Sequence, residues 1–299
     1  MPHTAFATTT RGLRRTAPPM VLFEKAKRLG TWNPSDIDFA QDIKDWRLFT
    51  DEERDAVLRL TASFAAGEEA VTLDLLPLMQ AITRRGLCEE SIYLTSFLWE
   101  EAKHADFFDR FLSEVAREEK GLDRYHLPCY KAIFYDALPA AMNALIDDDS
   151  PRAIVRAATT YNLVVEGIIA ETGYHAYFLA LDQKDLLPGT RSAISKIKKD
   201  EARHIAFGIY LLSRFISTDA ALWDVVQETM NEMLALTMGM IHEMFTPYET
   251  PPFGQDESVF QEFAMGQFGK RINRLDRART MSHASIDALT CSVIEEDDA

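Results

Sequence analysis

The chain is poor in cysteine. Three cysteines, Cys88, Cys129 and Cys291, occur among its 299 residues, and no two of them have the CxxC spacing of a zinc site. An odd and small number of cysteines is typical of free thiols in a reducing compartment. We therefore expect a cytoplasmic protein without a thiolate metal site.

Basic charge is also in short supply. The sequence has 32 lysines and arginines against 47 acidic residues, a net charge of -15 and a pI near 4.9. Nucleic-acid binding requires a basic stripe that neutralises phosphates. This balance argues against a nucleic-acid partner.

Long uninterrupted apolar runs are absent as well. The most apolar window, Tyr161 to Leu181, is interrupted by Glu166, Glu171 and His175, so no segment reads as an integral membrane span. With 47% hydrophobic residues, the chain can nevertheless bury a large core. We predict a single helical domain over residues 30–280.

The two ends differ from the rest of the chain in composition. The first twenty residues contain no acid but hold three arginines among threonines, without the apolar core of a signal peptide. We expect residues 1–29 to form a flexible N-terminal arm. Residues 281–299 end in four consecutive acids and are expected to be a disordered acidic tail.

The hydrophobic pattern between these ends has the period of helices, with no alternating strands. Thr50 and Glu53 form a capping box at the start of a helix that reaches about residue 84, and Ser150-Pro151 starts another that reaches about residue 181. Further helices are predicted at 89–118, 128–146, 219–245 and 257–279, and one more around residue 201. The fold class is therefore all-α.

Two four-residue strings, Glu101-Ala102-Lys103-His104 and Glu201-Ala202-Arg203-His204, lie one hundred residues apart. A Glu and a His three residues apart project from one face of a helix. Glutamates inside apolar stretches, Glu68 and Glu166, precede the strings by 33 and 35 residues. The pattern predicts two pairs of helices, each giving one Glu and one Glu-x-x-His motif, as in a ferritin-like four-helix bundle.

These residues predict a dinuclear metal centre. One half would contain Glu68, Glu101 and His104, and the other Glu166, Glu201 and His204. Four carboxylates balance the charge of two divalent cations, and oxygen-rich ligation with one imidazole per ion suits iron or manganese. Glu101 is expected to bridge the ions, with Glu68 and Glu166 terminal.

Two neighbouring glutamates leave the ligand set open. Glu69 adjoins Glu68, and Glu100 adjoins Glu101 and would pair with His104 four residues later. The match between the two strings favours Glu101. Glu68 is favoured over Glu69 because it lies on an apolar stripe with Phe64 and Val71.

Residues 30–245 resemble the ribonucleotide reductase small-subunit superfamily, in particular its ligand-binding oxidase branch. The resemblance rests on the two Glu-x-x-His strings, Trp32-Asn33-Pro34 and Asp200 directly before Glu201. It implies the fold of those subunits, a manganese/iron cofactor (with di-iron as an alternative), and manganese in the Glu68 half. It also implies electron transfer through Trp32, Asp200 and His104. Dimers are common in this superfamily, so a homodimer is expected.

The oxidase branch further implies a bound long-chain fatty acid and an ether cross-link between a tyrosine and a valine. The positions that match are Tyr161, five residues before Glu166, and Val71, three after Glu68. Tyr174 is a candidate hydrogen-bond donor to the centre. The predicted activity is dioxygen activation for two-electron oxidation of a C–H bond, with electrons from an unknown reductant.

Two other functions stay open. A manganese/iron reductase small subunit is one, although Phe108 replaces the radical tyrosine and no tyrosine follows Tyr248 to relay a radical. The other is a lipid-binding or metal-storage protein whose dimetal centre turns over once.

Overall fold

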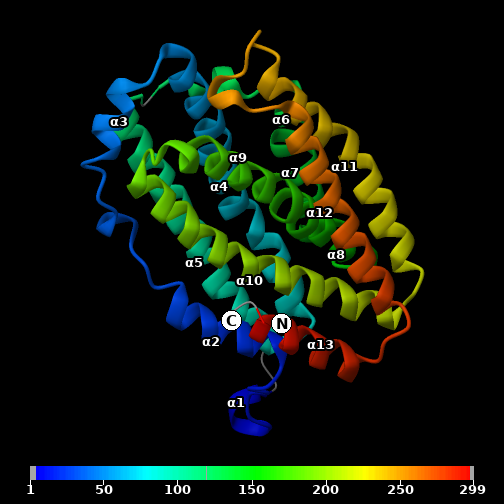
Figure 1. Cartoon of the computed structure of the whole chain (residues 1–299). Helices are drawn as coiled ribbons and strands as arrows, with labels where there is room; N and C mark the ends of the chain where they lie inside the picture. Colours follow the sequence, from blue (N-terminus) through cyan, green and yellow to red (C-terminus); the bar gives the residue numbers. More distant parts are fainter. Residues whose placement is uncertain (1–4, 119, 297–299) are drawn as a thin grey trace.

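Four long helical segments form a bundle in the computed structural model, which describes residues 5–118 and 120–296 (Figure 1). They are α4 (Asp51–Arg84), α5 (Cys88–Arg110), the continuous segment from Pro151 to Leu181, and α10 (Pro188–Thr218). Within the described ranges there is no strand, so the predicted all-α, ferritin-like fold is confirmed.

Shorter helices surround this bundle. Those before it are α1 (Ala7–Thr10), α2 (Pro18–Leu29) and α3 (Asp42–Leu48). Between its halves lie α6 (Pro128–Lys131) and α7 (Leu138–Asn143), and after it follow α11 (Leu222–Phe245), α12 (Glu257–Ala278) and α13 (His283–Glu296). Helices α11 and α12 lie side by side along the bundle (Figure 1).

The helix starts follow from local hydrogen bonds. Thr50 Oγ1 accepts from the backbone N–H of Glu53, whose carboxylate accepts from the N–H of Thr50. Ser150 Oγ accepts from the N–H of Ala153, with Pro151 in the first helical position. The predicted capping box and N-cap are therefore confirmed.

The third bundle segment is not a uniform α-helix. Between α8 (Pro151–Ala158) and α9 (Glu171–Leu181), residues Thr159–Ala170 (η6) are wound as a π-helix. In a π-helix the hydrogen bonds join residues five apart, and the helix is wider than an α-helix, so residues five apart lie closer to one face. Tyr161 therefore lies nearer to the face of Glu166 than α-helical spacing predicts, which would put the two residues about one and a half turns apart.

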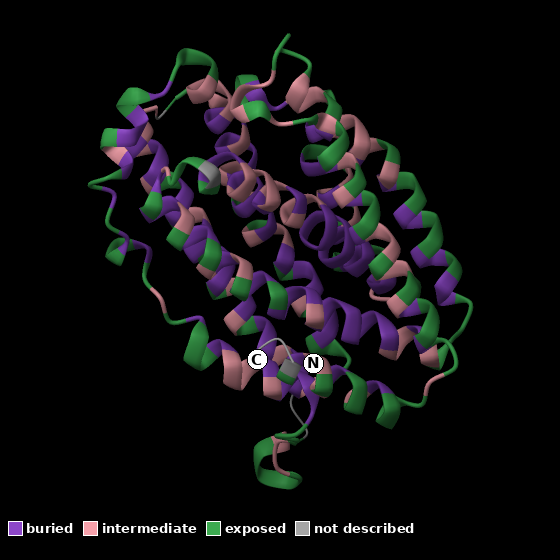
Figure 2. Ribbon diagram, in the orientation of Figure 1, coloured by how far each residue is buried: buried purple, intermediate pink, exposed green. Residues whose placement is uncertain are grey.

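Burial concentrates where the four segments meet (Figure 2). The segment Pro151–Leu181 has the length and apolarity of a membrane span, but 78% of its apolar window is buried inside the molecule. Its apolar character is accounted for by its central place in the core.

The ends differ from the expected flexible arm and disordered tail. Helix α2 packs on α5 and α10 through buried Leu22 and Ala26, and α13 packs on α2 and α10 through buried Ile286 and Ile294. In each helix every fourth residue is buried, and the polar residues between these positions make the pattern hard to recognise in the sequence. The outermost parts, residues 1–4 and 297–299, lie outside the described residues.

Candidate metal centre

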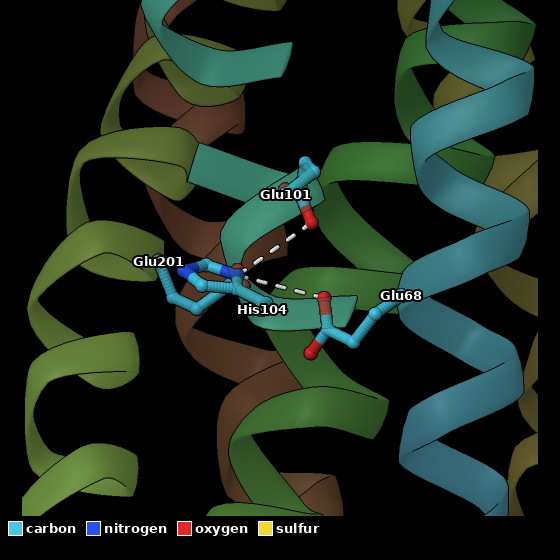
Figure 3. A group of neighbouring side chains, drawn as sticks. All are labelled: Glu68, Glu101, His104 and Glu201. Atoms are coloured by element: carbon cyan, nitrogen blue, oxygen red, sulfur yellow. Dashed lines mark ion pairs between the residues drawn. The ribbon is translucent and has the colours of Figure 1, made fainter. Parts of the chain in front are cut away.

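The structure brings the six predicted ligands together in the middle of the bundle. Glu68 comes from α4, Glu101 and His104 from α5, Glu166 from η6, and Glu201 and His204 from α10. Figure 3 shows Glu68 and Glu101 converging on His104 from two helices. All six side chains are buried.

Their facing atoms form two groups, in each of which they lie within 4.8 Å of one another. The first group is Glu68, Glu101, His104 and Glu201, and the second is Glu101, Glu166, Glu201 and His204. Both Glu101 and Glu201 belong to both groups. We expected only Glu101 to bridge the two ions, but the geometry would allow Glu201 to bridge them as well.

Each histidine turns one ring nitrogen inward and the other outward. Nδ1 of His104 lies 3.3 Å from Glu201 Oε1 and 3.5 Å from Glu68 Oε2, while Nε2 lies 3.2 Å from Asp200 Oδ2. Nδ1 of His204 lies 2.9 Å from Glu101 Oε1. The Nδ1 atoms are the ones placed to bind metal.

Several inward-facing atoms make no hydrogen bond among the described residues. They are Nδ1 of both histidines, Oε2 of Glu101 and of Glu201, and Oε1 of Glu166. Buried polar atoms without a partner are costly. Two divalent cations would satisfy all five atoms and neutralise the four carboxylates, so the cluster can hold a dimetal site.

In the absence of metal, protons take the place of the cations. Burial raises the pKa of Glu68 to about 8 and that of Glu166 well above its usual value. Burial lowers the pKa of His104, but the nearby carboxylates of Asp200, Glu101, Glu201 and Glu68 favour the protonated ring, outweigh burial and raise that pKa well above normal. Metal binding must therefore release protons.

The metal-free protein should lose stability as pH rises from about 5 to 8. Over this range the folded state holds protons on Glu68 that the unfolded state has already lost, since the ordinary pKa of a glutamate is 4.5. The raised pKa of His104 acts in the same direction above 6.5. Thermal unfolding of chelator-treated protein at stepped pH values measures the decline.

The metal-loaded protein provides the comparison, because deprotonated ligands bind cations more tightly as pH rises. Its melting temperature should fall less over the same range, or rise. Equal slopes for the two forms would contradict the assignment of these residues as the titrating groups.

Glu100 has a role that the sequence interpretation missed. It is fully buried, and its Oε2 accepts from His204 Nε2 at 2.8 Å. Asp200 makes the corresponding contact with His104. The acidic residue directly before each string thus orients the histidine of the other string. The sequence does show an acidic residue in front of each ligand Glu, and this repeat could have indicated the role.

Glu100→Gln should weaken metal binding about 10- to 100-fold, the usual effect of losing a carboxylate that orients a metal-binding histidine. Glutamine keeps the size of the side chain but lacks the negative charge that strengthens the hydrogen bond from His204. Equilibrium metal titration against a competing chelator measures the change. Asp200→Asn should give a loss of similar size, and unchanged affinity in both variants would refute the orienting role.

The structure also distinguishes Glu68 from the adjacent Glu69 as the candidate ligand. Glu68 is buried among the facing carboxylates, whereas Glu69 is exposed on the outer side of α4. The preference for Glu68 therefore has a geometric basis that the sequence alone did not provide.

Tyrosines reach the cluster from two sides. Tyr161 Oη donates to Glu101 Oε1 at 3.5 Å, and Tyr174 Oη lies 3.3 Å from Glu68 Oε1 and 3.4 Å from Glu201 Oε1. Val71 is buried one turn after Glu68. Tyr161, Tyr174 and Val71 therefore all lie close to the cluster.

The proposed electron route also has the required contacts. Trp32 Nε1 donates to Asp200 Oδ2 at 2.8 Å, and the rings of Trp32 and His104 are nearly parallel with centroids 6.3 Å apart. Although burial opposes it, the hydrogen bond from His104 lowers the pKa of Asp200, so the carboxylate stays ionised.

An apolar cavity opens from the cluster toward the surface. Its inner end is formed by Glu68, Glu101, Glu166 and Glu201. Its outer end lies at the connector between α11 and α12, where Tyr248 and Gln255 line it. The wall between is mainly apolar: Leu60, Phe64, Val71, Phe134, Val165, Ile169, Met240, Ile241, Met244, Phe245 and Phe260.

The bundle and its two Glu/His groups define a helical dimetal-carboxylate protein of the ferritin-like class. A family model described as ribonucleotide reductase, small chain matches residues 22–275. The chain therefore belongs to the ribonucleotide reductase small-chain family.

Solved structures narrow the resemblance within that family. The chain is 39% identical to an R2-like ligand-binding oxidase with an aerobically reconstituted Mn/Fe cofactor, with a TM-score of 0.88, and the match covers 92% of this chain and 98% of that one. A tyrosine-to-phenylalanine variant of an R2-like ligand-binding oxidase is 38% identical, with a TM-score of 0.88, over 92% and 99% of the two chains. The predicted resemblance to this branch is confirmed.

Proposed function

We propose that this protein is a manganese/iron oxidase that activates dioxygen for two-electron oxidation of C–H bonds and holds a long-chain fatty acid beside the metals. One observation carries the proposal: the two Glu/His groups lie at the inner end of an apolar cavity. Such a cavity has room for an alkyl chain and places it against a redox-active centre. The structural relatives are ligand-binding oxidases with a Mn/Fe cofactor.

The proposed ligands are Glu68, Glu101 and His104 for one ion, and Glu166, Glu201 and His204 for the other. By resemblance, manganese occupies the Glu68 half. Bound there, the metal pair would supply electrons for the reduction of dioxygen and the oxidising power for C–H cleavage. The protein supplies the charge balance and fixes the ligands through Glu100 and Asp200.

Side chains next to the cluster exclude water and position protons. Phe108 is buried and stacks on Phe64 at a centroid distance of 5.2 Å, and Phe64 stacks on Tyr174 at 4.8 Å. Burial raises the pKa of Tyr174 well above its usual value, so its hydroxyl remains a donor to Glu68 and Glu201. An aromatic wall of this kind protects an oxidising centre from solvent.

We also propose the ether cross-link between Tyr161 and Val71. The Tyr161 O–H bond and the Val71 Cβ–H bond break, a bond forms between Oη and Cβ, and two protons and two electrons pass to dioxygen. Tyr161 is buried, and burial raises the pKa of its hydroxyl, so Tyr161 begins the reaction protonated. Glu101 Oε1, 3.5 Å away, is the nearest acceptor for its proton.

Other parts of the proposal concern partners. An electron donor would reduce the centre through half-buried Trp32 and then Asp200, which is hydrogen-bonded to both Trp32 and His104. A homodimer is consistent with exposed Leu73 and Leu76, one turn apart on α4. Location in the cytoplasm remains a prediction from the free cysteines.

A reductase small subunit is a weaker alternative. Phe108 cannot hold a phenoxyl radical, and the tail after Tyr248 contains no tyrosine to relay one. The second alternative is a lipid-binding or metal-storage protein whose dimetal centre turns over once. Measuring oxygen consumption distinguishes it from an oxidase. Protein reconstituted with manganese and iron should consume oxygen repeatedly when reductant and an oxidisable acid are supplied. A single stoichiometric uptake would favour the second alternative.

A further inference from the structure

The cavity beside the cluster has an unsatisfied polar group at its outer end. Arg59 lines this cavity and is 8% exposed, and its Nε makes no hydrogen bond among the described residues. A buried guanidinium N–H without an acceptor costs free energy. The position of Arg59 suggests that something entering the cavity provides the acceptor.

The other contacts of Arg59 leave Nε free. Nη2 lies 3.5 Å from Asp55 Oδ2, and the guanidinium lies over the rings of Tyr125 and Tyr248, at 4.9 and 6.0 Å from their centroids. The Asp55 carboxylate is shared, because both tyrosine hydroxyls donate to it at short distance. These contacts hold the side chain in place but do not satisfy Nε.

Other side-chain donors along the cavity are already used. Ser63 donates to the carbonyl of Arg59, Thr172 to that of Ile168, and Gln255 to that of Ala176. Among the described residues that line the cavity, the buried side-chain atoms without a hydrogen-bond partner are Arg59 Nε and carboxylate oxygens of Glu101, Glu166 and Glu201. The cavity thus has a donor at one end and a metal-binding cluster at the other.

The distance between these ends sets the length of a ligand. Arg59, Ser63, Gly67 and Val71 occur at every fourth position of α4 and all line the cavity. Glu68, at the metal end, follows Arg59 by nine residues, and nine residues of α-helix span about 14 Å. An extended chain advances about 3.6 Å for every three bonds, so about eleven bonds cover the distance.

We propose that the cavity selects a long-chain acid with a second polar acceptor, a hydroxyl or carboxylate, at the end away from the metals, and that Arg59 binds this group. The inference rests on the proposed function, in which the first carboxylate contacts the metals. An unsubstituted alkyl end would leave Arg59 Nε unpaired, whereas an ω-hydroxyl or ω-carboxylate would accept from it. Arg59 is thus a specificity-determining binding residue.

Calorimetric titration of delipidated, manganese/iron-loaded protein tests the proposal with dodecanoic acid, its ω-hydroxy derivative and the corresponding dicarboxylic acid. A hydrogen bond to a charged group predicts about ten- to hundredfold tighter binding of the two substituted acids. Arg59→Met keeps an apolar stem against the tyrosines and should remove the preference for the substituted acids. Octanoic acid and its ω-hydroxy derivative, too short to reach Arg59, should bind equally.

Arg152→Met, on the exposed surface, is the matched control and should keep the preference. Equal affinities of wild-type protein for the three long acids would overturn the role of Arg59 but leave the proposed function intact. If none of the acids bound, the fatty-acid part of the proposed function would fall as well. The wild-type comparison decides the question even if Arg59→Met does not fold.

Discussion

Glu68→Gln should abolish tight metal binding in its half of the centre, whereas Glu69→Gln should leave both metals bound. Glutamine lacks the charge that offsets a divalent cation, and the loss should exceed the roughly hundredfold seen for groups that only orient a ligand. Glu69 is exposed outside the cluster, so its charge contributes little there. Metal content after dialysis against a chelator measures both variants.

Loss of metal in Glu68→Gln should not reflect unfolding. Burial raises the pKa of Glu68 to about 8, so a neutral glutamine suits the metal-free site at least as well. The melting temperature of metal-free Glu68→Gln at pH 8 should equal or exceed that of metal-free wild type. A variant that retained both metals, or a Glu69→Gln variant that lost one, would reverse the assignment.

Tyr161→Phe should eliminate the cross-link completely. After aerobic reconstitution, wild-type protein should be lighter by two hydrogen atoms, with the peptides containing Val71 and Tyr161 joined. Phenylalanine has no oxygen to form the ether, so the variant should keep its full mass and yield separate peptides. Intact-mass measurement and a peptide map test this.

Tyr174→Phe is the matched control, because Tyr174 also contacts the cluster but through Glu68 and Glu201, whereas Tyr161 contacts Glu101. It should still form the link between Tyr161 and Val71. A mass deficit that persisted in Tyr161→Phe would identify another residue as the partner. Unlinked wild-type peptides despite full metal loading and oxygen exposure would count against the cross-link.

The helices and the cluster could be predicted because they depend on local spacing. Thr50 with Glu53 and Ser150 with Pro151 are short-range capping signals, and both helix starts are confirmed. The repeated Glu-x-x-His spacing places two side chains on one helix face without reference to the rest of the fold. These patterns act over a few residues, so the chain alone reveals them.

The ends of the chain were harder, because their structure depends on what they pack against. Ile286 and Ile294 lie in a short helix near the end of the chain and are buried because α2 and α10 pack against it. The π-helical winding of Thr159–Ala170 has no reliable sequence signal, yet it places Tyr161 on the side of Glu166. From the sequence, Glu100 was only an alternative metal ligand. Its contact with His204 could not be predicted, because the two residues are 104 positions apart.

The sequence by itself determined an all-helical protein with two matching Glu/His strings and two upstream glutamates, because these features repeat at spacings that a helix converts directly into shared faces. Only the tertiary structure decided that Glu101 and Glu201 lie in both metal-binding groups, that Glu100 contacts His204 while Asp200 contacts His104, and that Arg59 lines the cavity beside the cluster. These relations join residues that are distant in the chain, and packing of the helices against one another is what sets them side by side.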